Sequence, residues 1–333
     1  MTRRGRLDIR VVSVLAALLA ATFAALVASV ALGEFSIPPL DVVATLAGAG
    51  DRATNFIVLD LRLPRALTGL LAGAALGIAG AVFQDVTRNP LAAPDVLGVA
   101  GGASLAAVAL IVFSSGSAVS VPLVALAGAL TAGTALYVFA WRRGIHGYRI
   151  VLIGIGVSVF AQAGIAYVLA KGRIFEVAQA YVWMVGSLNG RGWSQVWPLV
   201  AALVVLVPVL YALGRRADVL ALGDDVARAL GLGVERTRLL MLGLAVGLTG
   251  IAVAAAGPIG FVAFVAPHIS RRLAHVRTAQ GLLALSAATG SVLVLLADLV
   301  GRLAFSPHEI PVGIVTSILA APYFLFLLRR GTA

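Results

Sequence analysis

The sequence predicts an all-α protein that crosses a membrane many times. Of its 333 residues, 61% are hydrophobic and only 12% are charged, and the mean hydropathy is +1.04. Soluble domains carry about a quarter charged residues, and disordered chains combine low hydrophobicity with high charge, so both classes are excluded. The apolar runs are continuous instead of alternating over about ten residues, which argues against a β-barrel.

Ten apolar segments are candidate transmembrane helices, because a spanning helix needs about 20 residues. The first runs from Val11 to Gly33 and is longer than the apolar region of a signal peptide, so it is predicted to be a retained helix. The other nine are predicted at residues 66–84, 95–113, 119–140, 149–170, 195–213, 237–256, 259–274, 279–299 and 309–328. Residues 1–333 are therefore expected to form one transmembrane domain.

The placement of basic residues predicts that both termini lie in the cytoplasm. In that orientation 18 of the 25 basic residues and seven of the 14 acidic residues fall on the cytoplasmic side, which then carries the whole net charge of +11. This distribution satisfies the positive-inside rule. Because topology and the lipid bilayer explain the charge, no nucleic-acid partner is expected.

Two glycine motifs suggest an internal repeat. GAALGIAG begins at Gly73 and GLAVGLTG begins at Gly243, and each is followed by a proline, Pro90 or Pro258. Small residues at this spacing let helices pack closely, which is sufficient to explain each motif alone. The motif helices are five spans apart, however, and an odd offset would make the two halves an inverted repeat, as in many transporters.

The most polar internal stretch, residues 214–238, is predicted to be a cytoplasmic loop containing a short helix. Asp224 can cap this helix, with Val226, Ala227 and Leu230 on one face. The helix could lie among lipid headgroups or dock a cytoplasmic partner. Three aspartates, at 218, 224 and 225, favour docking because acidic residues are disfavoured against anionic lipid.

Several chemistries find no support in the sequence. The chain has no cysteine, which excludes disulfides and thiolate sites, and its one lysine, Lys171, is not part of a P-loop motif. No two of the four histidines have metal-ligand spacing, so no metal or haem site is expected. A serine protease built from Ser104 and His268 lacks the remaining machinery. Asp298 is the candidate for ion coupling, or it pairs with Arg302.

Motifs along the whole chain then indicate a family. They are LRLPR at 61–65, RNPLAAPDVLG at 88–98, LALGDDVARALGLG at 220–233, GPIGF at 257–261, PHI at 267–269 and EIPVG at 309–313. Together they resemble the FecCD family of ABC importer permeases, which serve iron–siderophore, haem and vitamin B12 uptake. Residues 141–157, 185–190 and 223–241 are most similar to the G-type subunit of the ferric-enterobactin permease.

The resemblance implies a fold like that of the vitamin B12 permease and a multi-pass subunit of the bacterial inner membrane. It implies a second, paralogous permease subunit, two ATPase subunits that bind ATP and Mg, and an external substrate-binding protein. The chain itself would hold no cofactor, metal or catalytic residue. The expected function is alternating-access import of a ferric siderophore, of the catecholate type. The alternatives are haem or vitamin B12 import, and an ion-coupled secondary transporter.

The resemblance also implies roles for particular residues. Docking to the ATPase would use Leu220, Leu222, Gly223, Asp224, Asp225, Val226, Ala227, Leu230 and Gly231. Docking to the binding protein would use Arg62, Arg65 and Arg302, since guanidinium groups pair with carboxylates; the alternative is anchoring at the headgroups. A cytoplasmic gate would include Asn89, Leu91, His146, Gly147 and Tyr148, the last three standing where the vitamin B12 permease has small hydroxyl residues.

Overall fold

The computed structural model describes residues 9–33, 37–114, 120–141, 147–304 and 307–329, and within these ranges every regular element is a helix. The elements are α1 (Ile9–Ala31), α2 (Pro39–Leu46), α3 (Arg52–Asn55), the π-helix η1 (Phe56–Arg62), α4 (Leu63–Thr87), α5 (Val99–Phe113), α6 (Ser120–Ala140), α7 (Gly147–Lys171), α8 (Ile174–Met184), α9 (Trp193–Ala221), α10 (Asp224–Ala229), α11 (Val234–Ala256), α12 (Val262–Ala274), α13 (Ala279–Leu303) and α14 (Val312–Arg329). The predicted all-α class is confirmed.

Seven of these helical stretches are long and apolar enough to cross a membrane. They are α1, the continuous stretch Arg52–Thr87, α6, α7, α9, α11 and α13. The shorter α5 and α14 are also apolar, and each of the ten predicted spans falls on a helix. The multi-pass architecture therefore agrees with the sequence, while the number of ten spans and the side on which the termini lie remain predictions.

The observed helix ends differ from the predicted ones where the backbone turns. α5 begins at Val99, after a turn that follows Pro94 and ends in the left-handed Gly98, with φ of 82°. α12 begins after Phe261, which is also left-handed, with φ of 65°. α9 continues to Ala221, so the stretch predicted as a loop at 214–238 is largely helical.

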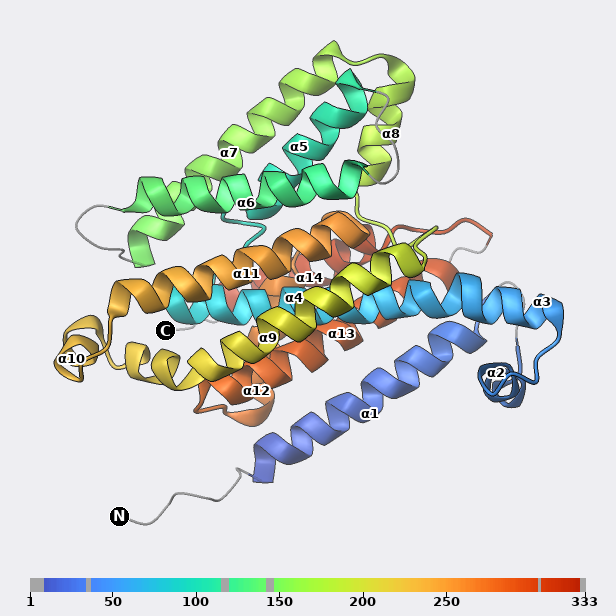
Figure 1. Cartoon of the computed structure of the whole chain (residues 1–333), viewed down its shortest axis with the longest axis horizontal. Coiled ribbons are helices and arrows are strands. Elements are labelled where there is room, and N and C mark those ends of the chain that lie inside the picture. The colour runs from blue at the N-terminus through green and yellow to red at the C-terminus, as the bar shows by residue number, and fades with distance from the viewer. Residues whose placement is uncertain (1–8, 34–36, 115–119, 142–146, 305–306, 330–333) are drawn as a thin grey trace.

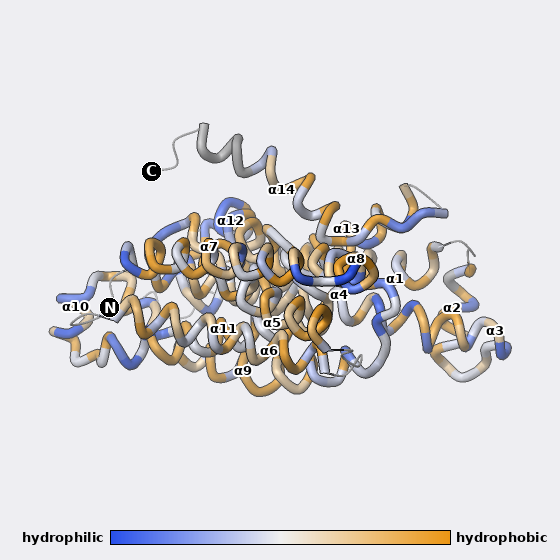
Figure 2. Tube along the Cα trace, turned by 90° about the horizontal axis from the view of Figure 1, so that it is seen from above, coloured by the Kyte–Doolittle hydropathy of each residue, from blue (hydrophilic) through white to orange (hydrophobic). Residues whose placement is uncertain are grey.

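The bundle has two polar ends. α10 lies at one end of its long axis and α3 at the other (Figure 1), and the hydrophilic segments gather mainly towards these ends (Figure 2). We call them the α10 end and the α3 end. The residues predicted to face the cytoplasm, such as Arg88 and Arg238, lie at the α10 end, where α4 stops and α11 starts.

α4 occupies the centre of the bundle and packs through backbone contact. Its neighbours include α13, α11, α12 and α9. A side chain at Gly73 would strike the backbone of Gly290, and one at Gly77 would strike the carbonyl of Ser286. Gly80 lies in the same way against the carbonyl of Ala263. Such close approach lets helices associate through dispersion contacts and not through hydrophobic burial, which lipid weakens.

The second glycine motif packs differently. On α11, Gly250 lies against Leu126 and Ala129 of α6. A side chain at Gly243, in contrast, would meet no other atom within 4 Å. The arrangement is still reciprocal, because α4 packs on α13 and α11 packs on α6, and the two motif helices run in opposite directions (Figure 1). This pair of contacts is what an inverted repeat would produce, although the glycines are used unequally.

Candidate functional site

A cleft of about 560 Å³ opens at the α10 end of the bundle. It lies between the C-terminal end of α4, the first residues of α7 and the helix α10. Its lining consists of Val86, Thr87, Arg88, Gly147, Tyr148, Leu222, Gly223, Asp224, Asp225, Val226, Arg228 and Arg238. Residues predicted to dock the ATPase and residues predicted to form the gate therefore border one cleft.

Asp224 is the centre of the polar contacts around this cleft. Arg238 of α11 donates to its two carboxylate oxygens over 2.8 and 2.7 Å, and Arg88 donates over 2.9 Å. Arg88 also donates to the carbonyl of Leu220, over 2.6 Å. Burial raises the pKa of the Asp224 carboxyl, but the hydrogen bonds and charges of Arg238 and Arg88 outweigh this effect and hold the pKa below its ordinary value.

Three apolar side chains in and beside α10 are exposed. Leu222, Val226 and Leu230 are 63%, 48% and 64% exposed. Ala227, which the sequence placed on the same face as Val226 and Leu230, instead points inwards and is fully buried in a small cluster with Leu220 and Val234. The shared-face prediction is wrong at Ala227, because this turn of helix places that small side chain against the ends of α9 and α11.

Two glycines bracket α10. Gly223 and Gly231 have φ of 113° and 80°, conformations that residues with a Cβ rarely adopt. Gly223 stands immediately before the helix, so Asp224 is its first residue and not its cap. The Asp224 side chain is thereby free to meet the arginines.

Gly147 and Tyr148, two of the predicted gate residues, line this cleft, and Asn89 directly follows Arg88 of its lining. The Asn89 carboxamide oxygen accepts a hydrogen bond of 2.9 Å from the Leu91 amide, which closes the turn after α4. Gly147 opens α7 directly against the backbone of Thr87, and Tyr148 next to it is strongly exposed. His146, the remaining gate candidate, lies outside the described residues. Sequence reasoning missed the pairing of Arg88 and Arg238 with Asp224, from which they lie 136 and 14 positions away in the chain.

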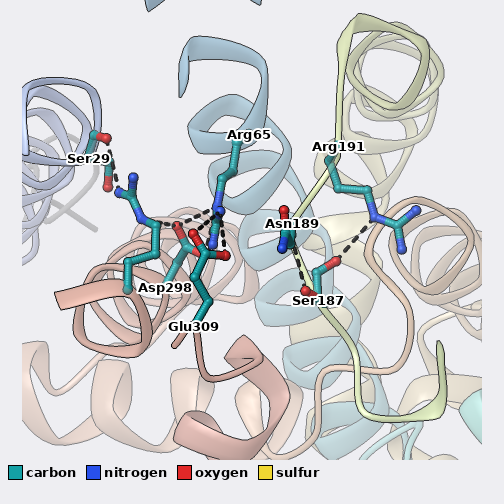
Figure 3. Close-up of polar contacts among 8 residues, drawn as sticks. Ser29, Arg65, Ser187, Asn189, Arg191, Asp298 and Glu309 are labelled. Carbon is teal, nitrogen blue, oxygen red and sulfur yellow. Dashed lines mark hydrogen bonds and ion pairs between the residues drawn. The ribbon is translucent and has the colours of Figure 1, made fainter. Parts of the chain in front are cut away.

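The three arginines predicted to dock the binding protein lie near one another, because Arg62 and Arg302 bind neighbouring carbonyls of α1 and Arg302 shares Asp298 with Arg65. Figure 3 shows Arg65 with its two acidic partners. Arg65 pairs with Asp298 over 2.9 Å and with Glu309 over 3.0 Å, and Arg302 pairs with Asp298 over 3.2 Å. The predicted pairing of Asp298 with Arg302 is therefore confirmed. Glu309 is 37% exposed, so this edge of the cluster reaches the surface.

Arg62 and Arg302 also hold the end of α1. Arg62 donates to the carbonyls of Val30 and Ala31 over 2.9 and 3.0 Å, and Arg302 donates to the carbonyl of Ser29 over 3.0 Å. The last carbonyls of a helix have no hydrogen-bond donors within the helix, and these arginine side chains provide the missing donors. Two of the three predicted docking arginines thus serve the fold in this structure; Arg62 is buried and Arg302 is partly buried.

Arg191 is a further cation in the same region, on the loop between α8 and α9 (Figure 3). Its Nε donates to the carbonyl of Ser187 over 3.1 Å. Burial lowers its pKa. Unlike Arg65, it forms no ion pair with any acid in the part of the chain that the structure describes.

Long apolar helices packed through glycine, with polar surfaces at both ends, define a multi-pass membrane protein. The sequence profile of the FecCD transport family matches residues 17–330. The chain belongs to this family. The resemblance found in the motifs is therefore confirmed over nearly the whole length.

Curated relatives in the family are permease proteins. The chain is 42% identical to YfhA of Bacillus subtilis strain 168, assigned to a siderophore transport system, over 94% of this chain and 93% of that one. It is 41% identical to FepG of Escherichia coli K12, of ferric enterobactin transport, covering 89% of each. It is 39% identical to FhuG of B. subtilis strain 168, of iron(3+)-hydroxamate import, covering 91% and 92%.

A solved structure shares the fold closely. It is described as a metal-chelate type ABC transporter in an inward-facing conformation, with a TM-score of 0.86 at 26% identity, covering 96% of this chain and 99% of that chain. The chain is therefore a permease subunit and not an enzyme, since ATPase activity in such transporters belongs to separate subunits.

Proposed function

We propose that this chain is the membrane permease subunit of an ABC importer that carries a ferric siderophore, of the catecholate type, through the bacterial inner membrane. The observation that carries the proposal is α10, which exposes Leu222, Val226 and Leu230 beyond the long apolar helices of a FecCD family chain. An exposed apolar surface of this kind marks a site of contact with another protein or with lipid, and the aspartates at 218, 224 and 225 disfavour anionic lipid. An ATPase subunit fits this surface, because these 333 residues contain no P-loop motif with which to bind ATP.

The transporter would contain two permease subunits, this chain and a paralogue, with two ATPase subunits at the α10 end and a binding protein at the α3 end. ATP-driven movement of the ATPases would displace α10 and open the bundle alternately to each side. The likeness to a transporter solved in an inward-facing conformation supports this alternating access. Asn89, Leu91, His146, Gly147 and Tyr148 would close the pathway on the cytoplasmic side.

For the binding protein, the structure favours Arg65 among the three arginines as the point of contact. Its partner Glu309 is the half-exposed member of the cluster, whereas Arg62 and Arg302 are committed to carbonyls of α1. A carboxylate of the binding protein would meet the Arg65 guanidinium in competition with Glu309. Such charges at the rim of an interface mainly set association rate and register.

The cargo class rests on the segments that resemble the ferric-enterobactin permease. FepG, named for ferric enterobactin, and YfmE of B. subtilis strain 168, named for Fe(3+)-citrate import, are both 41% identical to this chain. Identity alone therefore does not separate these cargoes, and the assay must compare them directly.

The decisive experiment reconstitutes the purified complex in liposomes and follows uptake of radioactive iron. Ferric catecholate, ferric hydroxamate and ferric citrate are compared with haem and vitamin B12, with ATP enclosed at the ATPase side or with an ion gradient alone. We expect ATP-dependent accumulation of the catecholate. Uptake driven by the gradient without ATPase subunits would establish a secondary transporter instead, and preference for another cargo would remove the catecholate assignment.

A further inference from the structure

One carboxylate, that of Asp224, is shared by arginines from three helices. Arg88 ends α4, Arg238 lies in the second turn of α11, and Arg228 belongs to α10 itself. The N···O distances are 2.9 Å to Arg88, 2.7 Å to Arg238 and 3.9 Å to Arg228. Asp224 therefore joins the short helix α10 to the ends of two long helices.

The two long helices joined in this way form the interior of the molecule. Of the seven long apolar helices, the stretch containing α4 and the helix α11 are the two most buried. α4 also makes the backbone contacts with α13 and α12 described above. A force applied at the end of α4 or α11 would therefore reach the packed core, whereas α5 to α8 lie to one side (Figure 1).

The apolar attachment of α10 lies on the side of α9 and α11. Ala227 is buried in a cluster with Leu220 and Val234, at the ends of these two helices, and Val219 and Leu232 pack against this cluster. The backbone on either side of α10 passes through Gly223 and Gly231, the residue type with the greatest conformational freedom. The side chain of Arg88, which also binds the Leu220 carbonyl, is thus the link between α10 and α4.

A second link joins α10 to α11 through Arg238, and it is held at two points. Arg238 is only 3% exposed and holds both oxygens of Asp224 in a two-point contact. Charge-assisted, bidentate hydrogen bonds are the strongest of the side-chain contacts and fix orientation as well as distance. Asp225, the neighbouring acid, is fully exposed and pairs with Arg228 over 3.3 Å.

We propose that Asp224 is a positioning residue that transmits displacement of α10 to the core, through Arg88 to α4 and through Arg238 to α11. The inference rests on the proposed function, since it assumes that a bound ATPase moves α10. It adds to that function the path by which the movement reaches the helices around α4. Without the link, α10 would shift between its flanking glycines while α4 stayed in place.

The test uses the purified complex with its ATPases in liposomes, and compares Arg88→Gln with Arg236→Gln. Arg88→Gln leaves the Arg238–Asp224 pair in place, so α10 keeps its fold. Arg236→Gln is the matched control, because it makes the same change at an exposed arginine in the first turn of α11. We expect Arg88→Gln to assemble and hydrolyse ATP normally, with iron uptake per ATP reduced about tenfold, within the range of coupling between sites. Arg236→Gln should match the unmodified complex.

A distance measurement gives a second readout. The chain has no native cysteine, so spin labels can be placed at Asp225→Cys and Leu91→Cys alone. With Arg88 present, their distance should stay constant when ATP binds; in Arg88→Gln it should change. Normal uptake per ATP in Arg88→Gln, or loss of complex assembly, would overturn the inference. Absence of ATP-dependent uptake in the unmodified complex would instead overturn the proposed function.

Discussion

Arg65 on α4 and Asp298 on α13 form an ion pair in which nitrogen and oxygen are 2.9 Å apart, although the residues are separated by 233 positions in the sequence. The same carboxylate pairs with Arg302 one helical turn along α13. Because the Asp298 side chain is only 4% exposed, two guanidinium groups depend on one buried anion. The acid that the sequence marked as an ion-coupling candidate is therefore committed to holding α4 and α13 together.

Replacing Asp298 by Asn should destabilise the protein strongly. Removing one partner of a buried ion pair typically costs about 3–5 kcal/mol, because the remaining charge is left uncompensated. Thermal unfolding in detergent should show a large loss. Glu309→Gln, which removes the half-exposed partner of Arg65, should change the free energy of unfolding by less than about 1 kcal/mol. Equal effects of the two substitutions would contradict this account.

The two glycine motifs give a matched pair of packing variants. Gly77→Leu would force a side chain into the backbone of Ser286 and should cost roughly 1–3 kcal/mol or more through overpacking. Gly243→Leu places the same side chain in open space on α11 and should be tolerated. The measurement is the thermal unfolding temperature of both variants in detergent. An unchanged unfolding temperature of the Gly77→Leu protein would mean that α4 and α13 separate easily.

A charge placed on α10 should release the ATPase. Leu230→Asp leaves the long apolar helices intact, because Leu230 lies outside them, but puts a carboxylate in the centre of the proposed contact. An uncompensated charge buried at an interface costs several kcal/mol. Co-purification of the ATPase should be lost with Leu230→Asp and kept with Leu230→Met, which preserves apolar volume. Full ATPase retention by Leu230→Asp would place the docking surface elsewhere.

The docking role of Arg65 can be tested without disturbing the fold. Since Glu309 competes for Arg65, Glu309→Gln should raise the affinity for the binding protein severalfold at low salt, and the gain should fade as salt screens the charges. Asp60→Asn, at the same end and exposed, is the control for a general change in charge. Binding titrations at two ionic strengths measure both, and identical affinities of the two variants would remove Arg65 from the interface.

The course of the helices could be predicted from the sequence, because a long apolar run in a chain with so few charges has few other structures available. The ends of α5 and α12 could not. Phe261 adopts a left-handed conformation that its residue type disfavours, so only its surroundings in the fold account for the start of α12. The extension of α9 to Ala221 was missed because its last two turns are polar and a hydropathy pattern stops before them.

The candidate site was predictable in its location and less so in its contacts. The acidic, glycine-flanked composition around Asp224 predicts a short helix that could dock a partner, and the structure has a helix there, at a polar end of the bundle. The pairing of Asp224 with Arg88 joins residues 136 positions apart, and no local pattern reveals it. Arg62 was interpreted as a surface group because arginine usually is one, whereas α1 ends beside it and its carbonyls needed donors.

The contact between Gly73 and Gly290 also bears on how a permease of this kind can diversify. Two backbones that touch at these positions leave no volume for any other residue type on either helix. A library that randomises both positions should return glycine alone, whereas randomising Gly243 should return many residue types. New cargo preferences would then have to arise from substitutions on surfaces away from this pair. The contact between α4 and α13 would stay the same in permeases that differ in cargo.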